Sequence, residues 1–258
     1  MPNINFNKKK TFIFIIKDKA IKLKRESKLM ENLLKENEVL DDLQLNNLMI
    51  IQNRNNYRFT SDSVLLSNFV KVGHKDFVVE FCSGSGVISI LINEKYKPKN
   101  IIGFEIQKEL CEMSNRTLQY NNIKNINFIN KDLSMAYEDV GVGKVDVLVC
   151  NPPYYILPED NSNINQKYFL TKYEVSTSLK DIFCSAEKIL KYSGKFFMVH
   201  VPSRLQEIMC VAKENNFICK KLQFLYPNDK KELSHLVLCY FTKGGNNGCD
   251  VVKPKILN

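Results

Sequence analysis

The sequence of 258 residues has no tryptophan, only three histidines and, despite eight cysteines, no C-x-x-C pair. Structural zinc sites use closely spaced cysteines and histidines, so this spacing argues against the common zinc-binding classes and we expect no metal. Several cysteines lie in apolar runs, where the thiol behaves as a small buried hydrophobic group. Free thiols persist in a reducing compartment, and we therefore expect a cytoplasmic protein.

Long apolar runs are lacking near the N-terminus. The run found there extends only from Phe12 to Ile16 and is followed at once by Lys17, Asp18 and Lys19. A secretory signal needs a longer apolar region with a small-residue cleavage site, and a membrane span needs about 20 apolar residues. We therefore expect neither, and no membrane partner.

Acidic residues are scarce at the start of the chain. Residues 1–35 contain ten Lys and Arg but only three Asp and Glu, so they carry +7 of the net charge of +9. This asymmetry predicts a basic N-terminal arm at 1–35 and a folded domain at 36–258. A basic arm fits a polyanionic partner such as a nucleic acid, but a solvated, disordered tail has the same composition.

From residue 77 onward, mostly apolar strand-like stretches alternate with helix-like stretches. Such alternation is typical of an α/β fold, in which helices cover both faces of a parallel sheet. The last two strand-like stretches are joined by a turn-containing loop, which predicts an antiparallel C-terminal strand. We therefore expect a mostly parallel, seven-stranded sheet. Its strands are expected at 77–82, 101–105, 126–129, 145–150, 195–201, 220–226 and 236–241, and helices at 87–95, 107–121 and 178–192.

Two helices are expected before this alternation. The first is expected at 29–50, where Leu29, Leu33 and Leu34 have helical spacing, and it is followed by a short connection. The segment Thr60-Ser61-Asp62-Ser63 is a helix-start signal ahead of the apolar stretch 64–70.

A glycine-rich turn follows the first strand of the expected sheet, in the segment VVEFCSGSGVI at 78–88. Gly84 and Gly86 allow a sharp turn and a close approach of the backbone to a ligand. The dinucleotide-binding fingerprint has a third glycine, and Ser89 stands in its place, which argues against a pyrophosphate site. A variant of this loop binds the methionine part of S-adenosyl-L-methionine. In that variant the acidic residue before the loop, here Glu80, faces the ammonium end of the cofactor.

Carboxylates stand at or just after the ends of the next two strands. Glu105 lies 19 residues beyond Gly86, where this type of fold places an acid against ribose hydroxyls. A carboxylate can accept both hydrogen bonds of a vicinal diol. Asp132 follows the third strand, where it can accept a hydrogen bond from the adenine amino group, begin the next helix, or do both. With the glycine loop, these residues favour S-adenosyl-L-methionine as the cofactor.

The fourth strand runs into Asn151-Pro152-Pro153-Tyr154. The two prolines stiffen this tetrad and remove two N–H donors. An aromatic amino group is a poor nucleophile because its lone pair is delocalised into the ring. The Asn151 side-chain oxygen and the Pro152 carbonyl can accept its two hydrogens, localise the lone pair and direct it toward a methyl donor. Tyr154 can stack on an extruded base. The tetrad therefore predicts methylation of a planar amino nitrogen.

These residues resemble the class I S-adenosylmethionine-dependent methyltransferases. More narrowly, they resemble bacterial tRNA(Val) (adenine-37-N6)-methyltransferases over about residues 36–258. This narrower resemblance rests on YRFTSDSVLL at 57–66, GFEIQ at 103–107 and the tetrad at 151–154. It implies a Rossmann-like fold, S-adenosyl-L-methionine as cofactor and tRNA as partner, and we expect a monomer. Many members carry Asp where Glu80 stands, and the basic arm is not part of the family pattern.

The resemblance also implies a role for each matching residue. Asp62 and the helix after it would close over the cofactor. The cofactor would contact Glu80, Gly84 and Gly86 at its methionine end, Glu105 at its ribose and Asp132 at its adenine, while Asn151, Pro152, Pro153 and Tyr154 would bind the target base. Three alternatives share the tetrad and stay open: glutamine-N5 methylation of a release factor, and amino methylation of DNA or of rRNA.

Overall fold

The computed structural model of the protein describes residues 33–55, 58–157 and 173–257. The basic arm predicted at 1–35 lies outside these residues, except for its last three positions.

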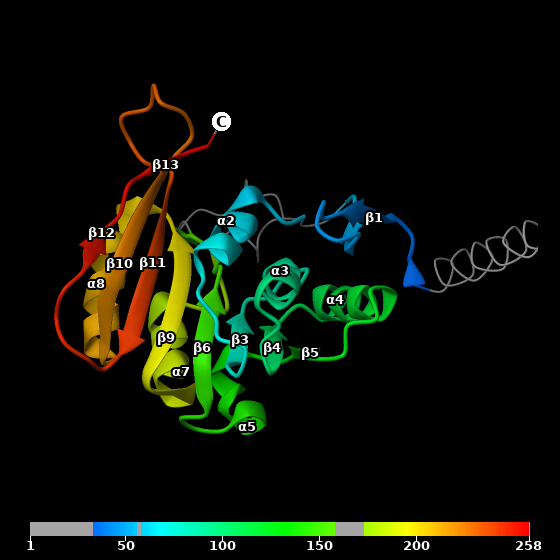
Figure 1. Ribbon diagram of the computed structural model, residues 1–258, viewed down its shortest axis with the longest axis horizontal. Helices are drawn as coiled ribbons and strands as arrows, with labels where there is room; N and C mark the ends of the chain where they lie inside the picture. The colour runs from blue at the N-terminus through cyan, green and yellow to red at the C-terminus, as the bar shows by residue number, and fades with distance from the viewer. Residues whose placement is uncertain (1–32, 56–57, 158–172, 258) are drawn as a thin grey trace, which may run out of the picture.

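A single sheet forms the centre of the protein (Figure 1). Its main strands are β3 (Phe77–Phe81), β4 (Asn100–Glu105), β5 (Ile126–Asn130), β6 (Val145–Cys150), β9 (Leu190–His200), β10 (Phe217–Tyr226) and β11 (Leu236–Lys243). Their order is β10-β11-β9-β6-β3-β4-β5. β3, β4, β5, β6 and β9 are mutually parallel, and β11 is antiparallel to β9 and β10. The short strands β12 (Asp250–Val251) and β13 (Lys255–Ile256) extend the β10 edge.

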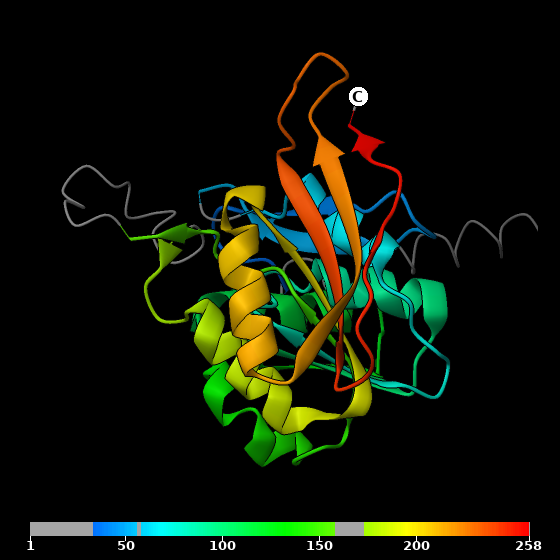
Figure 2. The ribbon, with the colours of Figure 1, turned by 90° about the vertical axis from the view of Figure 1, so that its left-hand side faces the viewer.

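Helices cover both faces of the sheet (Figures 1 and 2). On one face lie α2 (Ser61–Phe69), α3 (Val87–Tyr96) and α4 (Lys108–Tyr120), and on the other lie α5 (Tyr137–Val140), α7 (Leu179–Ile189) and α8 (Leu205–Glu214). Short 3-10 turns, η1 (Leu133–Met135) and η3 (Pro202–Arg204), precede α5 and α8. The predicted α/β class is therefore confirmed, and all seven predicted strands are present, in a sheet that has nine strands among the described residues.

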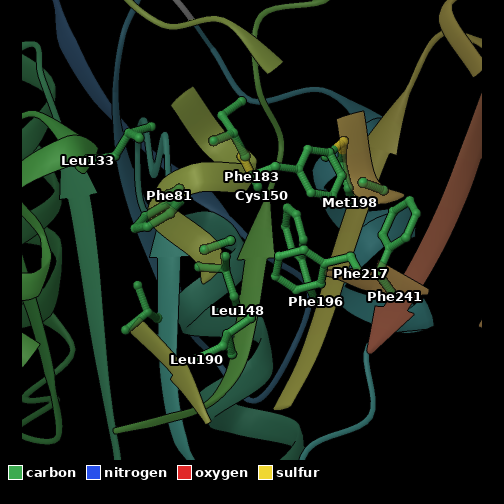
Figure 3. Close-up of a cluster of buried hydrophobic side chains, with 14 of the residues drawn as sticks. Phe81, Leu133, Leu148, Cys150, Phe183, Leu190, Phe196, Met198, Phe217 and Phe241 are labelled. Atoms are coloured by element: carbon green, nitrogen blue, oxygen red, sulfur yellow. The ribbon is translucent and has the colours of Figure 1, made fainter. Parts of the chain in front are cut away.

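The core is divided between the two faces by the alternation of strand residues. Along β6, Leu148 and Cys150 pack into one buried cluster while Val147 and Val149 pack into the other. Successive strand side chains point to opposite faces, so an apolar strand of this kind needs helices on both sides. Edge-to-face aromatic pairs join β9, β10, β11 and α7 in the first cluster, among Phe183, Phe196, Phe217 and Phe241 (Figure 3).

The helix predicted for 29–50 is wrong over its greater part. Residues 38–53 instead form an antiparallel hairpin of β1 (Glu38–Asp42) and β2 (Met49–Asn53). Gln44, Asn46 and Asn47 in its loop have positive φ angles of 53°, 49° and 58°, a conformation that asparagine tolerates better than most residues. The Asn-Asn pair therefore marked a turn, and the leucine spacing before it was too short a pattern to outweigh it.

The hairpin packs on α4. The Ile51 N–H donates to Thr117 Oγ1 (3.1 Å). Arg116 forms a two-point ion pair with Glu38, at 2.5 and 2.6 Å, and also donates to the Leu33 carbonyl. Leu33, at the end of the predicted arm, is buried in a small cluster with Ile51, Leu110 and Met113. These contacts join the start of the described chain to the helix that follows β4.

Candidate active site

A cavity of about 320 Å³ lies at the carboxyl ends of β3, β4, β5 and β6. Parallel sheets bind ligands at this edge because the loops that follow neighbouring strands converge there. Eight of the ten residues predicted for the site line the cavity: Asp62, Gly84, Glu105, Asp132, Asn151, Pro152, Pro153 and Tyr154. Glu80 and Gly86 lie outside its lining.

Glu105 joins two loops at the floor of the cavity. Its carboxylate accepts hydrogen bonds from the backbone N–H groups of Gly84 (2.8 Å) and Gln107 (2.9 Å). The side chain is almost fully buried, and this burial raises the pKa of the carboxyl above its usual value, against the opposing effect of the N–H donors. Each carboxylate oxygen keeps a further acceptor position, so Glu105 can still bind a ligand hydroxyl.

Glu80 lies beneath the glycine loop. One oxygen of its carboxyl accepts from the Ser89 N–H (3.0 Å) and the Ser89 hydroxyl in the first turn of α3. Burial raises the pKa of Glu80 to about 8, so the neutral form predominates at pH 7. The other oxygen has no partner among the described residues. Glu80 therefore binds the N-terminal turn of α3, where the dinucleotide fold places a pyrophosphate.

Gly86 sits behind the cavity wall. It caps α3 in the left-handed region, with φ of 78°. A β-carbon at this position would lie 2.3 Å from the Phe128 ring, and one at Gly103 would lie 2.4 Å from the same ring. The glycine loop and β4 thus both pack closely against Phe128.

Asp132 begins the 3-10 turn η1. Its Oδ1 accepts from the Ser134 N–H (2.8 Å), so the predicted capping role is confirmed. Asp132 also lines the cavity, and its Oδ2 can accept a hydrogen bond from a ligand there.

The tetrad contacts the start of α2. Asn151 Nδ2 donates to Ser63 Oγ (3.1 Å). The Tyr154 hydroxyl lies 2.7 Å from Asn151 Oδ1 and 3.0 Å from Asp62 Oδ2. α2 begins within the predicted helix-start segment, with Thr60 at its N-cap position, but the Thr60 side chain makes no capping hydrogen bond. Asp62 and Ser63, in the first turn of α2, instead contact the tetrad.

The Tyr154 ring is supported from behind. The fully buried His200 ring lies 5.2 Å from it, centroid to centroid. Burial, aided by the charge of Arg204, lowers the pKa of His200 to about 4, so this ring is neutral. Arg204 donates to the Tyr154 carbonyl (3.3 Å) and pairs with Glu174 (2.7 Å). These contacts of Arg204 fix the backbone that follows the tetrad.

Several other residues line the cavity although no role was predicted for them, among them Arg58, Gln107, Tyr155, Ser176, Thr177 and His235. Arg58 and Gln107 belong to the segments on which the family resemblance rests. Tyr155 belongs to β7 (Tyr155–Ile156), which pairs with β8 (Tyr173–Glu174) at the cavity rim. Ser176 and Thr177 follow β8, and His235 precedes β11. No sequence motif marked these last residues, because only the folded chain brings them to the tetrad.

The cavity is richer in acidic than in available basic groups. Among the described residues, three carboxyl side chains line it, those of Asp62, Glu105 and Asp132. Of the basic residues that also line it, Arg58 pairs with Asp41, and Lys131 pairs with Glu138 and Asp139. The lining therefore favours a cationic ligand over an anionic one.

Among the described residues, no group of His, Cys, Asp and Glu has an arrangement that could hold a metal ion. No helix within this part of the chain is long and apolar enough to cross a membrane.

The fold and the placement of the site are those of a class I methyltransferase. The model of the methyltransferase small domain family matches residues 59–217, which is more than half of the chain, and the chain belongs to that family. The predicted superfamily is therefore confirmed, and the family supports S-adenosyl-L-methionine as the predicted cofactor.

Among solved structures, a predicted O-methyltransferase from Agrobacterium tumefaciens has a TM-score of 0.61 at 16% identity, over 76% of this chain and 86% of that one. At this identity the likeness establishes the fold alone.

Two relatives are named for methylation of different substrates. A putative protein N5-glutamine methyltransferase of Methanocaldococcus jannaschii is 39% identical over 40% of this chain and 50% of its own length. A tRNA1(Val) (adenine(37)-N6)-methyltransferase of a Flavobacteriaceae bacterium is 20% identical over 72% of this chain and 78% of its own length. The chain spans half or less of the length of its higher-identity relatives.

Proposed function

We propose that this protein transfers a methyl group from S-adenosyl-L-methionine to N6 of an adenine in tRNA, with adenine 37 of a valine tRNA as the first candidate. The observation that carries the proposal is the lining of one cavity by Asn151, Pro152, Pro153 and Tyr154, opposite the carboxyls of Glu105 and Asp132. The tetrad matches a planar amino group, and the carboxyls match a nucleoside with free hydroxyls and an amino group.

The cavity fits the cofactor by its charge and by the hydrogen-bond acceptors in its lining. S-adenosyl-L-methionine supplies an electrophilic methyl group on a positively charged sulfur. The acidic lining favours such a cation, whereas Glu80 already binds the N-terminal turn of α3 that a pyrophosphate would need. In this proposal Glu105 accepts from the ribose hydroxyls, Asp132 accepts from the adenine amino group, and Gly84 lets the backbone approach the methionine end.

Glu80 and Gly86 act on the cofactor indirectly in this proposal. Glu80 fixes the first turn of α3 through Ser89, and Gly86 allows α3 to begin directly over Phe128. Both therefore set the position of the loop that carries Gly84.

The tetrad acts by positioning. The Asn151 side-chain oxygen and the Pro152 carbonyl accept the two hydrogens of the target amino group, which localises the nitrogen lone pair. Tyr154 stacks on the base, and the neutral His200 ring supports it from behind. No strong base is needed, because the amine loses its proton after the methyl group has transferred.

The extent of the two likenesses favours a nucleic acid over a protein substrate. The tRNA methyltransferase relative aligns along 72% of this chain, whereas three glutamine methyltransferase relatives align along 40%, 54% and 57%. At the cavity rim, Tyr155 is 47% exposed and offers a second aromatic face for a neighbouring base. Glutamine-N5 methylation remains the second candidate, because the shorter likeness has the higher identity and a glutamine amide is also planar.

The deciding experiment offers both substrates to the enzyme. Unmodified valine tRNA and a recombinant release factor are each incubated with labelled S-adenosyl-L-methionine, and the products are analysed by nucleoside and peptide mass spectrometry. We expect N6-methyladenosine in the tRNA and no label in the release factor. Label only in the release factor would establish the second candidate instead.

The basic arm is proposed to bind tRNA phosphates. Residues 1–32 lie outside the described residues, so the proposal rests on their charge. Deleting residues 1–28 should weaken tRNA binding regardless of the tRNA sequence. It should also flatten the slope of log affinity against log salt concentration by about 0.7–0.9 per lost phosphate contact. Identical slopes with and without the arm would assign it no part in recognition.

A further inference from the structure

Two side chains with a permanent positive charge line the cavity among the described residues, Arg58 and Lys131. S-adenosyl-L-methionine is positively charged overall, through its sulfonium and ammonium groups, but its amino-acid end also carries a carboxylate. The acidic groups of the lining give this carboxylate no partner. We propose that Arg58 binds the carboxylate of the methyl donor, with the Thr60 hydroxyl as a second donor. This inference rests on the proposed function for the identity of the cofactor, but not for the group that is methylated.

Lys131 is poorly suited to this role. Its ammonium nitrogen lies 2.6 Å from Asp139 and 3.3 Å from Glu138, so two carboxylates already offset its charge. It also directly precedes Asp132, which the proposed function places at the adenine end of the cofactor, far along the molecule from the carboxylate. Arg58 is therefore the better candidate of the two.

The guanidinium of Arg58 keeps donors for a ligand. Its Nη2 contacts Asp41 Oδ2 (2.5 Å), but a guanidinium has five N–H donors arranged in a planar fork. The two side chains of this pair are 50% and 30% exposed, and an ion pair in contact with water is weak. The remaining N–H groups can bind a second carboxylate, because the fork matches both of its oxygens.

A hydrogen-bond network from the β1–β2 hairpin positions Arg58. Asp41 Oδ2, which contacts the guanidinium, also accepts from Gln52 Nε2 (2.6 Å). The other end of the Gln52 amide accepts from the Phe59 backbone N–H (2.9 Å). Gln52 is only 2% exposed. This single buried side chain therefore holds both the acid that orients the guanidinium and the backbone next to Arg58.

The same hairpin places Arg58 on the side of the glycine loop. The hairpin packs on α4, and Ser114 Oγ of α4 lies 2.8 Å from the carbonyl oxygen of Gly84. The proposed function puts the methionine end of the cofactor at Gly84, so the carboxylate would lie on this side of the cavity. Thr60 also lines the cavity, and its side chain makes no capping hydrogen bond with α2. Its hydroxyl can therefore donate to the same carboxylate.

Two ligands that differ only by this carboxylate test the inference. Isothermal titration calorimetry compares S-adenosyl-L-methionine with its decarboxylated form, which keeps the ammonium and sulfonium groups. The wild type should prefer the ligand that has the carboxylate, and Arg58→Met should lower this preference by about tenfold, the effect of a charge-assisted hydrogen bond. Arg58→Met should bind the decarboxylated ligand at least as tightly as the wild type, which also reports that the variant is folded. Lys131→Met removes the same charge from the lining and should keep the preference.

The other outcomes overturn the inference. Equal affinity of the wild type for the two ligands would leave the carboxylate without a partner in the protein. An equal loss of affinity for both ligands in Arg58→Met would mean that Arg58 only shapes the cavity. The same fall in preference in Lys131→Met would reduce the effect to the net charge of the lining. If Arg58→Met bound both ligands normally but bound tRNA more weakly, Arg58 would instead contact RNA phosphates.

The test is independent of the methyl acceptor. Calorimetry is carried out without tRNA or release factor, so it decides the role of Arg58 whichever of them the enzyme methylates. Failure of the proposed tRNA function would appear in the products of methylation, whereas failure of this inference would appear in the affinities for the two ligands.

Discussion

The carboxylate of Glu105 lies 2.8 Å from the backbone nitrogen of Gly84, although the two residues are 21 positions apart. This hydrogen bond connects the loop after β3 with the end of β4, and both residues line the cavity. Glu105 can therefore shape the glycine loop and contact a ligand at the same time.

Replacing Glu105 tests the cofactor site. Glu105→Ala removes an acceptor from the ligand and leaves the Gly84 N–H unpaired, so binding of S-adenosylhomocysteine should weaken by about 1–3 kcal/mol. Isothermal titration calorimetry measures this change. Glu109→Ala, an exposed acid in the first turn of α4, serves as the control. If NAD bound the wild type as tightly as S-adenosylhomocysteine, the cofactor assignment would be refuted.

Replacing Asn151 tests the methyl-transfer step. Asn151→Ala removes the side-chain acceptor and should nearly abolish turnover, while affinity for the cofactor stays within a few-fold. Tyr154→Ala should lower activity more than Tyr154→Phe, because only the alanine variant loses the stacking face. Single-turnover kinetics with labelled cofactor separate the two effects. Asn127→Ala, an exposed position on β5, is the control, and full activity in Asn151→Ala would contradict the lone-pair argument.

The buried Glu80 should make the stability of the protein depend on pH. Its pKa is about 8 in the folded protein, against 4.5 for an unperturbed glutamate. The unfolded chain therefore releases this proton at lower pH than the folded one, and the free energy of unfolding falls as pH rises from about 4.5 to about 8. In Glu80→Gln this contribution is absent. Urea unfolding at pH 5 and pH 8 should show a smaller loss in the variant; equal losses would mean that Glu80 is ionised in the folded protein.

The ion pair of Arg116 with Glu38 should stabilise the hairpin against α4. The two side chains are 14% and 6% exposed, so Arg116→Met removes the charged partner of a largely buried carboxylate, leaves it only the Lys35 N–H as a donor among the described residues, and should destabilise the protein by about 3 kcal/mol. The double variant Arg116→Met/Glu38→Met should be less destabilised than the single one. Lys35→Met breaks the exposed pair with Glu112 and should cost about 1 kcal/mol or less. Denaturant titrations of the four proteins test this order.

Oxidation should link the C-terminal segment covalently to the sheet. The Cys219 and Cys249 sulfur atoms lie 3.3 Å apart, and Cys249 is exposed. Treatment with diamide should convert these two thiols into a disulfide with the loss of two hydrogens, and should stabilise the protein by about 2–4 kcal/mol. Intact-mass and peptide mapping detect the bond. Cys249→Ser should abolish it while Cys184→Ser, which removes another exposed thiol, should not; a disulfide elsewhere would contradict the prediction.

The sequence by itself determined the sheet, the glycine loop and the tetrad. Each depends on a local pattern: apolar strands buried on both faces, two glycines where the chain turns, and two prolines after the fourth strand. Because parallel strands share one carboxyl edge, these patterns also placed Gly84, Glu105, Asp132 and Asn151 around one cavity. Local patterns were less reliable at element ends. The helix expected at 178–192 ends at Ile189, since β9 already starts at Leu190.

The tertiary structure decided what depends on contacts between distant residues. Ser63 and Asn151 are 88 positions apart, and Asp62 and Tyr154 are 92. No local periodicity encodes such a contact, because it arises only when α2 packs over the end of β6. The β1–β2 hairpin, whose strands are stabilised by α4, likewise depends on contacts between distant residues. So does the environment of Glu80. The position of Glu80 before the glycine loop was readable from the sequence, but its hydrogen bonds with Ser89 followed from how closely α3 packs on β3.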